Sequence, residues 1–205
     1  MVSLNCEKKH LSETDNIMKI ILASKSPRRL ELLSGVYEQI EVVTAETDET
    51  LPNGTHPRQG VEILAVRKGR AVLPLVGDAF PVISSDTLVE LDGIPLGKPE
   101  NEKDTCRMLR TLSGRTHNVH TGVAVHYRGR VLSGVASTSV RFHTLSDETV
   151  NNYVKSGEPM DKAGAYGIQG LGGALVEGYE GDFDTVVGLS LALTKRLMKE
   201  IGADE

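Results

Sequence analysis

The chain has 205 residues and a net charge of −5, with 39% hydrophobic and 25% charged residues, as expected for one globular domain or for two small lobes that share a core. The acidic balance, the 4% aromatic content and the absence of Trp argue against a broad nucleic-acid-binding face and against stacking platforms for single strands. No apolar run approaches the ~20 residues of a membrane span, and Cys6 and Cys106 have neither metal-ligand nor disulfide spacing, so we expect a cytoplasmic protein with no membrane partner.

The first 17 residues are polar and include Glu7, Lys8, Lys9 and His10, which is unlike a signal peptide. We expect residues 1–17 to form a mobile polar extension. Residues 18–205 are predicted to form a single domain.

The first predicted strand, Ile20–Leu22, runs into a tight turn and then a helix. Ser26 is a good N-cap, and Pro27 suits the first helical position because it has no N–H to leave unpaired. Four polar side chains gather at this junction: Ser24, Lys25, Arg28 and Arg29. Two interpretations fit this junction equally well: a phosphate-binding site, or a solvated basic first turn of a helix. Cations at a helix N-terminus oppose the helix dipole, so their presence there asks for an explanation.

A second strand is predicted at Ile40–Val43, and an acidic loop that contains Asp48 and Glu49 follows it. Adjacent carboxylates near a cationic pocket suggest a divalent metal. The residues alone favour the simpler interpretation, a solvated acidic loop. Pro57 opens the next helix, whose cations include Lys68.

Four small polar residues, 84–87, separate two apolar runs. The first run, Phe80–Ile83, is predicted to be a buried strand, and the second continues to a hairpin turn at Asp92-Gly93, with Ile94–Leu96 as the return arm. Asp86 is therefore predicted to lie at the end of a buried strand, where α/β proteins gather ligands. The alternative is a turn-capping carboxylate, and we favour a functional role.

The remaining pattern alternates helices and strands. The predicted elements are a helix at Glu100–Leu112, antiparallel strands at His117–Tyr127 and Val131–Phe142, a helix from Ser146 to about Ser156, a short strand at Ala174–Val176 and a final helix that contains Leu189, Leu191, Leu193 and Leu197. Between the last two helices, residues 158–173 form a glycine-rich stretch that holds Gln169. We expect a loop that passes close to a ligand, although it matches neither a dinucleotide fingerprint nor a Walker loop.

Together, the basic helix start, the two carboxylate patches and the glycine-rich loop favour metal-assisted hydrolysis of a phosphate ester or anhydride. Acyl transfer is disfavoured because the sequence contains no Gly-x-Ser-x-Gly elbow and no cysteine in a catalytic setting.

Five motifs in order resemble the Maf family of nucleoside triphosphate pyrophosphatases. They are Ser24-x-Ser-Pro-Arg-Arg29, Ser85-Asp-Thr87, Gly97-Lys-Pro99, Leu112-Ser-Gly114 with His117, and Asp161-Lys-Ala-Gly-Ala-Tyr-Gly-Ile-Gln-Gly170. The resemblance implies a mixed α/β fold of the inosine-triphosphate-pyrophosphatase type, in which helices flank a twisted mixed sheet and two lobes surround a cleft. It also implies a homodimer and a divalent cation, Mg²⁺ or Mn²⁺.

The form of the last motif resembles the dTTP/UTP pyrophosphatase subgroup, which implies release of pyrophosphate from dTTP, UTP or modified pyrimidine nucleotides. The resemblance places the general base on Asp86, base specificity on Arg28, Thr87 and Gln169, and the family's acidic pair on Asp48 and Glu49. We expect Asp86 to ligate the metal with that pair and to orient the attacking water. The cations expected around the phosphates, with Ser24 beside them, are Arg28, Lys68, Lys98 and Lys162. Of these, Lys68 and Lys98 are expected to act in catalysis with Asp86.

Three alternatives remain open from the sequence. The chain could be a pyrophosphatase of the same fold with another base preference, such as 7-methyl-GTP. It could be a non-catalytic nucleotide-binding regulator of cell division, although the presence of Asp86, Lys98 and Lys162 argues against this. It could also be a glycine-rich structural domain without a site.

Overall fold

The computed structural model describes residues 18–204, so the predicted extension 1–17 and Cys6 lie outside the described residues. The strands are β1 (Lys19–Leu22), β2 (Gln39–Val42), β3 (Val82–Leu91), β4 (Ile94–Leu96), β5 (Thr116–Tyr127), β6 (Arg130–Phe142) and β7 (Val176–Glu180). The helices are α1 (Pro27–Ser34), α2 (Pro57–Val76), α3 (Glu102–Leu112), α4 (Asp147–Lys155), α5 (Phe183–Val187) and α6 (Leu191–Ile201), with short 3₁₀ turns η1 (Glu158–Asp161), η2 (Ala163–Ala165) and η3 (Leu171–Leu175). None of these helices has the length and hydrophobicity needed to cross a membrane.

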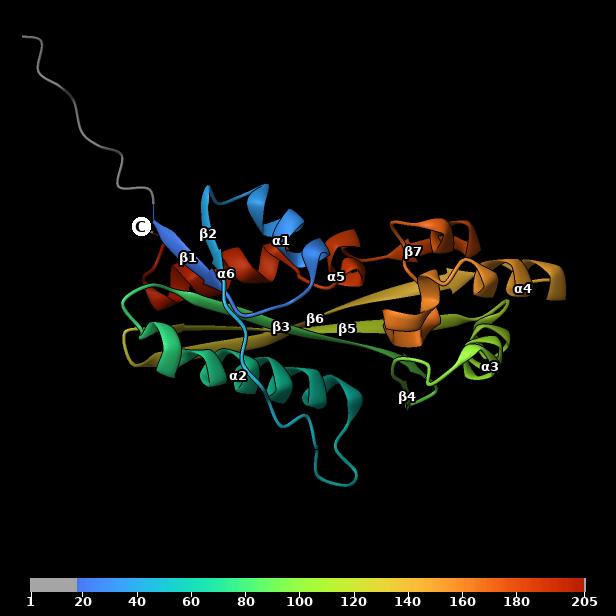
Figure 1. The fold of residues 1–205 in the computed structure, drawn as a ribbon, viewed down its shortest axis with the longest axis horizontal. Helices are drawn as coiled ribbons and strands as arrows, with labels where there is room; N and C mark the ends of the chain where they lie inside the picture. Colours follow the sequence, from blue (N-terminus) through green and yellow to red (C-terminus); the bar gives the residue numbers. More distant parts are fainter. Residues whose placement is uncertain (1–17, 205) are drawn as a thin grey trace, which may run out of the picture.

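The strands form one mixed, seven-stranded sheet in the order β2-β1-β3-β5-β6-β7, with β4 paired to β3 (Figure 1). β1 is parallel to β2 and β3, whereas the other neighbours are antiparallel. α2 covers one face of the sheet, and α1, α5 and α6 lie over the other (Figure 1). The predicted mixed α/β class is confirmed.

One edge of β3 is interrupted, and this interruption positions the functional site. β5 pairs with β3 from Val82 to Glu90 along one edge. On the opposite edge, β1 pairs only with Val82 and Ile83, and β4 pairs only with residues 89–91. Within residues 18–204, the β3 segment 84–88 therefore has no strand partner on that side, and we call this segment the β3 gap.

The position predicted for Asp86 was wrong. Asp86 was expected at the end of a buried strand, but it lies in the middle of β3, opposite Gly122 of β5. The strand continues because β5 pairs with it from Val82 to Glu90, even though β1 ends at Leu22. Asp86 is nevertheless accessible, because it lies just beyond the end of β1.

Two of the three core clusters lie in different lobes of the molecule, and a two-lobed fold was predicted. One lies around β1, α1 and α6 and includes Leu22, Leu33 and Met198. The other lies around α3, α4 and the 3₁₀ turns and includes Leu109 and Phe142. The strands β3 and β5 contribute to both clusters, so a continuous sheet joins the lobes (Figure 1).

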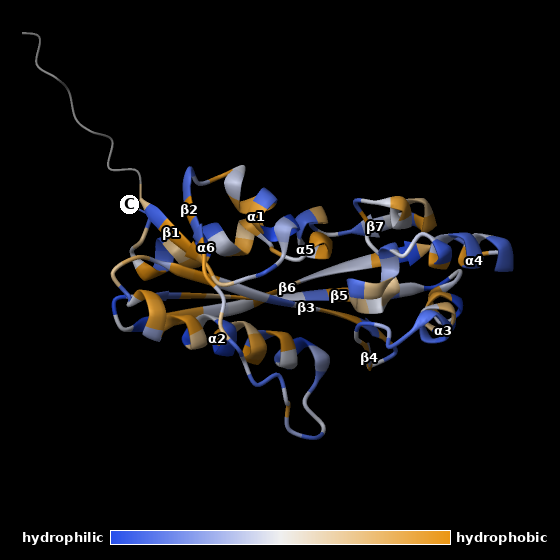
Figure 2. Ribbon diagram, viewed as in Figure 1, coloured by the Kyte–Doolittle hydropathy of each residue, from blue (hydrophilic) through white to orange (hydrophobic). Residues whose placement is uncertain are grey.

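α2 packs unusually closely on the sheet at Gly122. A Cβ atom at Gly122 would lie 2.3 Å from the main-chain oxygen of Val61. Figure 2 shows the hydrophobic residues of α2 as separate bands along the helix, as expected when one side packs on the sheet. This close approach sets the distance between α2, which carries Lys68, and the strands beside it.

Several local predictions differ from the structure. Ser26 occupies the N-cap position of α1, but its side chain makes no capping bond; its main-chain N–H instead donates to Ser24 Oγ. The glycine-rich stretch folds into the three 3₁₀ turns, so the following strand begins at Val176 rather than at Ala174. The short helix α5 was not predicted, because five residues are too few to establish a helical period.

The buried environment of His117 predicts that the folded protein becomes less stable at acid pH. The ring is buried against Phe142 and Tyr166; its Nε2 is 2.8 Å from the Tyr166 hydroxyl, and its Nδ1 has no hydrogen-bond partner in the described chain. Burial lowers the pKa of His117 to about 4. The folded state therefore binds fewer protons than the unfolded state between that value and the unfolded pKa of ~6.5.

We expect the His117 contribution to stability to be complete above pH ~6.5 and to decline as the pH falls toward 4, by up to about 3 kcal/mol. Urea unfolding at several pH values measures this dependence. His117→Gln retains an amide that can bond to Tyr166 but does not titrate, so its profile should be flatter. Parallel profiles for the two proteins would contradict the assignment.

Candidate active site

A pocket of about 970 Å³ opens between the two lobes at the β3 gap. Its lining includes Arg28, Asp86 and Gln169, which lie far apart in the sequence. The size lies within the range of small-molecule sites. The predicted convergence of these three residues on one cleft is therefore observed.

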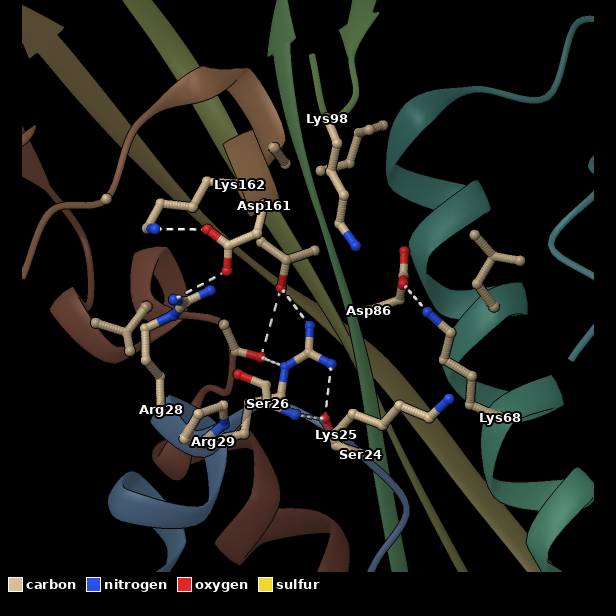
Figure 3. A pocket seen from close by; sticks show the side chains of 18 of the residues that line it. Ser24, Lys25, Ser26, Arg28, Arg29, Lys68, Asp86, Lys98, Asp161 and Lys162 are labelled. Atoms are coloured by element: carbon tan, nitrogen blue, oxygen red, sulfur yellow. Dashed lines mark hydrogen bonds and ion pairs between the residues drawn. The ribbon is translucent and has the colours of Figure 1, made fainter. Parts of the chain in front are cut away.

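On the α2 side of the pocket, Lys68 joins two carboxylates. Its Nζ lies 2.5 Å from Asp86 Oδ1 (Figure 3). The same Nζ lies 2.8 Å from Glu49 Oε1. Burial raises the pKa of Asp86, and this effect outweighs the opposing influence of Lys68. The hydrogen bond from Lys68 lowers the pKa of Glu49. The pKa values of the two carboxylates are thus shifted in opposite directions, and Asp86 is more basic than an exposed aspartate.

The opposite side of β3 carries an arginine whose role was not predicted. The Arg29 guanidinium donates to Ser85 O (2.9 Å), Gly188 O (2.8 Å), Ser24 Oγ (3.2 Å) and Thr87 Oγ1 (3.3 Å). Burial lowers the pKa of Arg29, and the charge of Asp86 opposes this effect. Arg29 therefore bonds to the main chain of β3 at Ser85, within the β3 gap. Its bonds to Ser24 and Thr87 fix the positions of these two side chains.

Asp86 and Thr87 are neighbours on β3, so their side chains point to opposite faces of the sheet. Both nevertheless line the pocket, because the gap opens the strand edge between the two faces. The Thr87 hydroxyl also lies 2.9 Å from Thr121 Oγ1. Only the interrupted edge allows one pocket to use both residues.

A third group of charges comes from α1 and η1. Arg28 Nη1 lies 3.6 Å from Asp161 Oδ2, and Lys162 Nζ lies 2.6 Å from Asp161 Oδ1 (Figure 3). Lys162 also donates to the main-chain oxygen of Glu158. Asp161 thus pairs with two of the cations that were predicted to surround phosphates.

Two other predicted site residues, Lys98 and Gln169, also line the pocket. Lys98 enters the pocket from the segment after β4, with its ammonium on the Asp86 side (Figure 3). Gln169 is exposed on the glycine-rich loop and lines the pocket, as do the apolar residues Val89 and Ile168. Charged side chains therefore lie both around Asp86 and beside the glycine-rich loop, and we call the group of Asp86, Lys68 and Lys98 the charged end of the pocket.

Asp48 is the predicted residue that the structure does not bring into the pocket. Its carboxylate is exposed and accepts a hydrogen bond from Thr50 N, and this bond lowers its pKa. Residues 18–204 contain no group of three or more His, Cys, Asp or Glu side chains placed to hold a metal ion. In the part of the chain that the structure describes, the carboxylates that pair with Lys68 are Glu49 and Asp86.

Comparison with known proteins establishes the family. The family described as Maf-like protein matches residues 19–201. The chain belongs to the Maf family. A dTTP/UTP pyrophosphatase from Bacillus velezensis is 44% identical over 182 residues, covering 89% of this chain and 96% of that protein. One from Thermococcus onnurineus is 46% identical over 183 residues, covering 89% and 97%.

Among solved structures, the Staphylococcus aureus Ham1 protein is similar, with a TM-score of 0.50 and 14% identity over 90% of this chain and 93% of that one. At this identity the likeness concerns the fold. The predicted Maf membership and fold type are confirmed for this chain.

Proposed function

We propose that this Maf-family chain hydrolyses dTTP and UTP, and modified pyrimidine triphosphates of the same shape, to the nucleoside monophosphate and pyrophosphate. The observation that carries the proposal is the meeting of Arg28, Asp86 and Gln169 in one pocket. It is supported by relatives named dTTP/UTP pyrophosphatase at 40–46% identity.

The charged end of the pocket suits attack of water on the α-phosphorus. A new P–O bond forms from water, the bond between the α-phosphorus and the bridging oxygen breaks, and the electron pair leaves with pyrophosphate. The proton of the water passes to Asp86, because burial has made this carboxylate more basic than an exposed one. Lys68 and Lys98 stabilise negative charge on the transferred group and the leaving group.

A divalent cation, Mg²⁺ or Mn²⁺, is proposed to bind with the substrate. Glu49 and Asp86 offer hard oxygen ligands around one point of positive charge, now supplied by the Lys68 ammonium. Two carboxylates plus substrate phosphates match the way Mg²⁺ is held in phosphoryl-transfer sites. When bound, the cation would supply charge neutralisation and Lewis acidity. Asp48 is not included, because its side chain lies outside the pocket.

Base selection is proposed to come from Gln169, Arg28 and Thr87. A uracil or thymine edge presents an O4 acceptor beside an N3–H donor, which a single amide can match. Arg28 can only donate, so at O4 it would disfavour the amine of cytosine. Ser24 and Lys162 are proposed to bind phosphate, which requires Lys162 to release Asp161.

Gln169→Ala is expected to lower the ratio of kcat/KM for dTTP to that for CTP by about 10-fold, because the amide that pairs with O4 and N3–H is lost. The ratio is measured with both substrates on parent and variant. Activity with the two substrates in the parent ratio would remove Gln169 from base selection.

The proposed function is tested by Mg²⁺- or Mn²⁺-dependent turnover of the eight common nucleoside triphosphates and of 7-methyl-GTP. Inorganic pyrophosphatase in the assay converts the product to phosphate for detection. Preference for dTTP and UTP is expected. Preference for 7-methyl-GTP, or binding without turnover, would replace the proposal with one of the alternatives. The homodimer, the cytoplasmic location and the single domain at residues 18–205 stay predictions.

A further inference from the structure

Glu158 is one of the residues that line the pocket, and no role in the reaction was predicted for it. Its carboxylate accepts three hydrogen bonds: from Leu171 N to Oε2 (2.8 Å), from Gly172 N to Oε1 (3.1 Å) and from the Tyr153 hydroxyl to Oε1 (2.9 Å). The two amides open η3, whose N-cap residue, Gly170, has no side chain to cap the turn. Glu158 therefore caps this turn from twelve residues upstream of Gly170.

The same carboxylate reaches the other side of Gln169 through Tyr153. The Tyr153 hydroxyl donates to Glu158 and accepts a hydrogen bond from Gly167 N at 3.1 Å. Main-chain amides at 167, 171 and 172 are thus all tied, directly or through one hydroxyl, to Glu158. Between these anchors lie Ile168, Gln169 and Gly170.

The packing around this anchor leaves no room for the loop to shift toward it. A Cβ at Gly170 would lie 2.5 Å from Glu158 Oε2, and a Cβ at Gly172 would lie 2.6 Å from the Tyr153 hydroxyl. The glycines next to Gln169 therefore let the main chain approach the carboxylate closely.

The carboxylate is held in its charged form. Partial burial alone would raise the pKa of Glu158, but the amides of Gly172 and Leu171 and the Tyr153 hydroxyl together lower it. An acceptor with two oxygens suits three converging donors, whereas an amide would present an N–H group to one of them.

We propose that Glu158 is a positioning residue that fixes the main chain on both sides of Gln169 and so sets base selection. This inference rests on the proposed function only for its activity readout. The side chain of Glu158 bonds to the loop, whereas its main-chain oxygen accepts a hydrogen bond from Lys162, so a change of the side chain leaves this contact with a proposed phosphate ligand in place.

The central variant is Glu158→Gln, which keeps the volume of the side chain and removes one acceptor. We expect the dTTP/CTP ratio of kcat/KM to fall about 10-fold, mainly through a higher KM for dTTP, with kcat for CTP within about 3-fold of the parent. In a Gln169→Ala background the same change should lower the ratio no further, because both act through one amide. Glu177→Gln, which removes an exposed ion pair with Arg141 in the same lobe, is the matched control and should keep the parent ratio.

A second readout needs no substrate. Hydrogen exchange at the amides of 167, 171 and 172 should be about 10-fold faster or more in Glu158→Gln than in the parent, and unchanged in Glu177→Gln. Unchanged exchange would overturn the inference, even if the enzyme prefers dTTP. Faster exchange with an unchanged dTTP/CTP ratio would also overturn it, because the loop would then be anchored without effect on base selection.

Tyr153→Phe covers the case in which Glu158→Gln does not fold. It removes the hydroxyl that joins Gly167 N to the carboxylate, so exchange at that amide should increase and the ratio should fall, while Leu171 N remains protected. A Tyr153→Phe protein with parent exchange and parent ratio would contradict the proposal. A parent enzyme that hydrolyses neither dTTP nor UTP would instead contradict the proposed function, and hydrogen exchange would still decide whether Glu158 holds the loop.

Discussion

Asp86→Asn is expected to reduce the turnover of dTTP about 10³-fold or more while the protein stays folded and binds nucleotide. The amide has the shape of the carboxylate but cannot accept the proton of the attacking water. Stability should be unchanged or higher, because burial disfavours the charge at Asp86 and Lys68 keeps Glu49 as a partner. Steady-state kinetics, thermal unfolding and nucleotide titration measure the three quantities.

Asp147→Asn provides the matched control for Asp86→Asn. Asp147 also pairs with a cation, Arg110, at 2.8 Å, but it is exposed on α4. It should retain parent turnover, since exposed ion pairs contribute ~0–1 kcal/mol and the residue is remote from the pocket. Normal turnover by Asp86→Asn would exclude Asp86 as the base and would reopen the assignment of the whole charged end.

Gly122→Ala should be among the most damaging single-methyl changes in the protein. The added Cβ would lie 2.3 Å from Val61 O and 2.7 Å from Glu62 N, both main-chain atoms of α2 that cannot rotate away. Relief requires α2 to move off the sheet, which we expect to cost about 3 kcal/mol. Because α2 carries Lys68 and Gly122 lies opposite Asp86, turnover should also fall. Urea unfolding and dTTP kinetics test both effects.

Gly134→Ala on the neighbouring strand separates this clash from the general cost of replacing a strand glycine. There the new Cβ would lie 3.2 Å from Leu193 Cδ1, the end of a flexible side chain. We expect a change in unfolding free energy within about 1 kcal/mol of zero. Equal stability of the two variants would show that α2 adjusts more easily than its main-chain contact implies.

Much of the fold could be predicted because many of its strands and turns follow simple local patterns in the sequence. Alternating residues in 117–127 and the turn at Asp92-Gly93 predict the strands and hairpin that the structure contains. The mixed order of the sheet could not be predicted locally, because it depends on which distant strands pair. The position of Asp86 was wrong for that reason: where β1 and β4 stop along β3 is a long-range property.

The sequence identified some residues of the pocket and missed others, again because long-range packing decides which side chains meet. The motifs identified Arg28, Asp86 and Gln169, and the pocket contains all three. They did not distinguish Arg28 from Arg29, because adjacent helix residues point in different directions and only the packed chain shows which one meets β3. Asp48 and Glu49 are also adjacent, and only Glu49 reaches Lys68. A signal for Glu158 was present in the glycines around Gln169, but its partners are known only once the loop is folded.

The continuity of β3 and β5 through both lobes has a consequence for motion. Ile83 and Val123 lie in one core cluster, and Val89 and Val119 lie in the other, on the same two paired strands. A rigid-body swing of one lobe against the other would have to bend this hydrogen-bonded ribbon across its width. Enclosure of a nucleotide should therefore come from the loop at residues 44–56, which carries Glu49, rather than from one concerted hinge between the lobes.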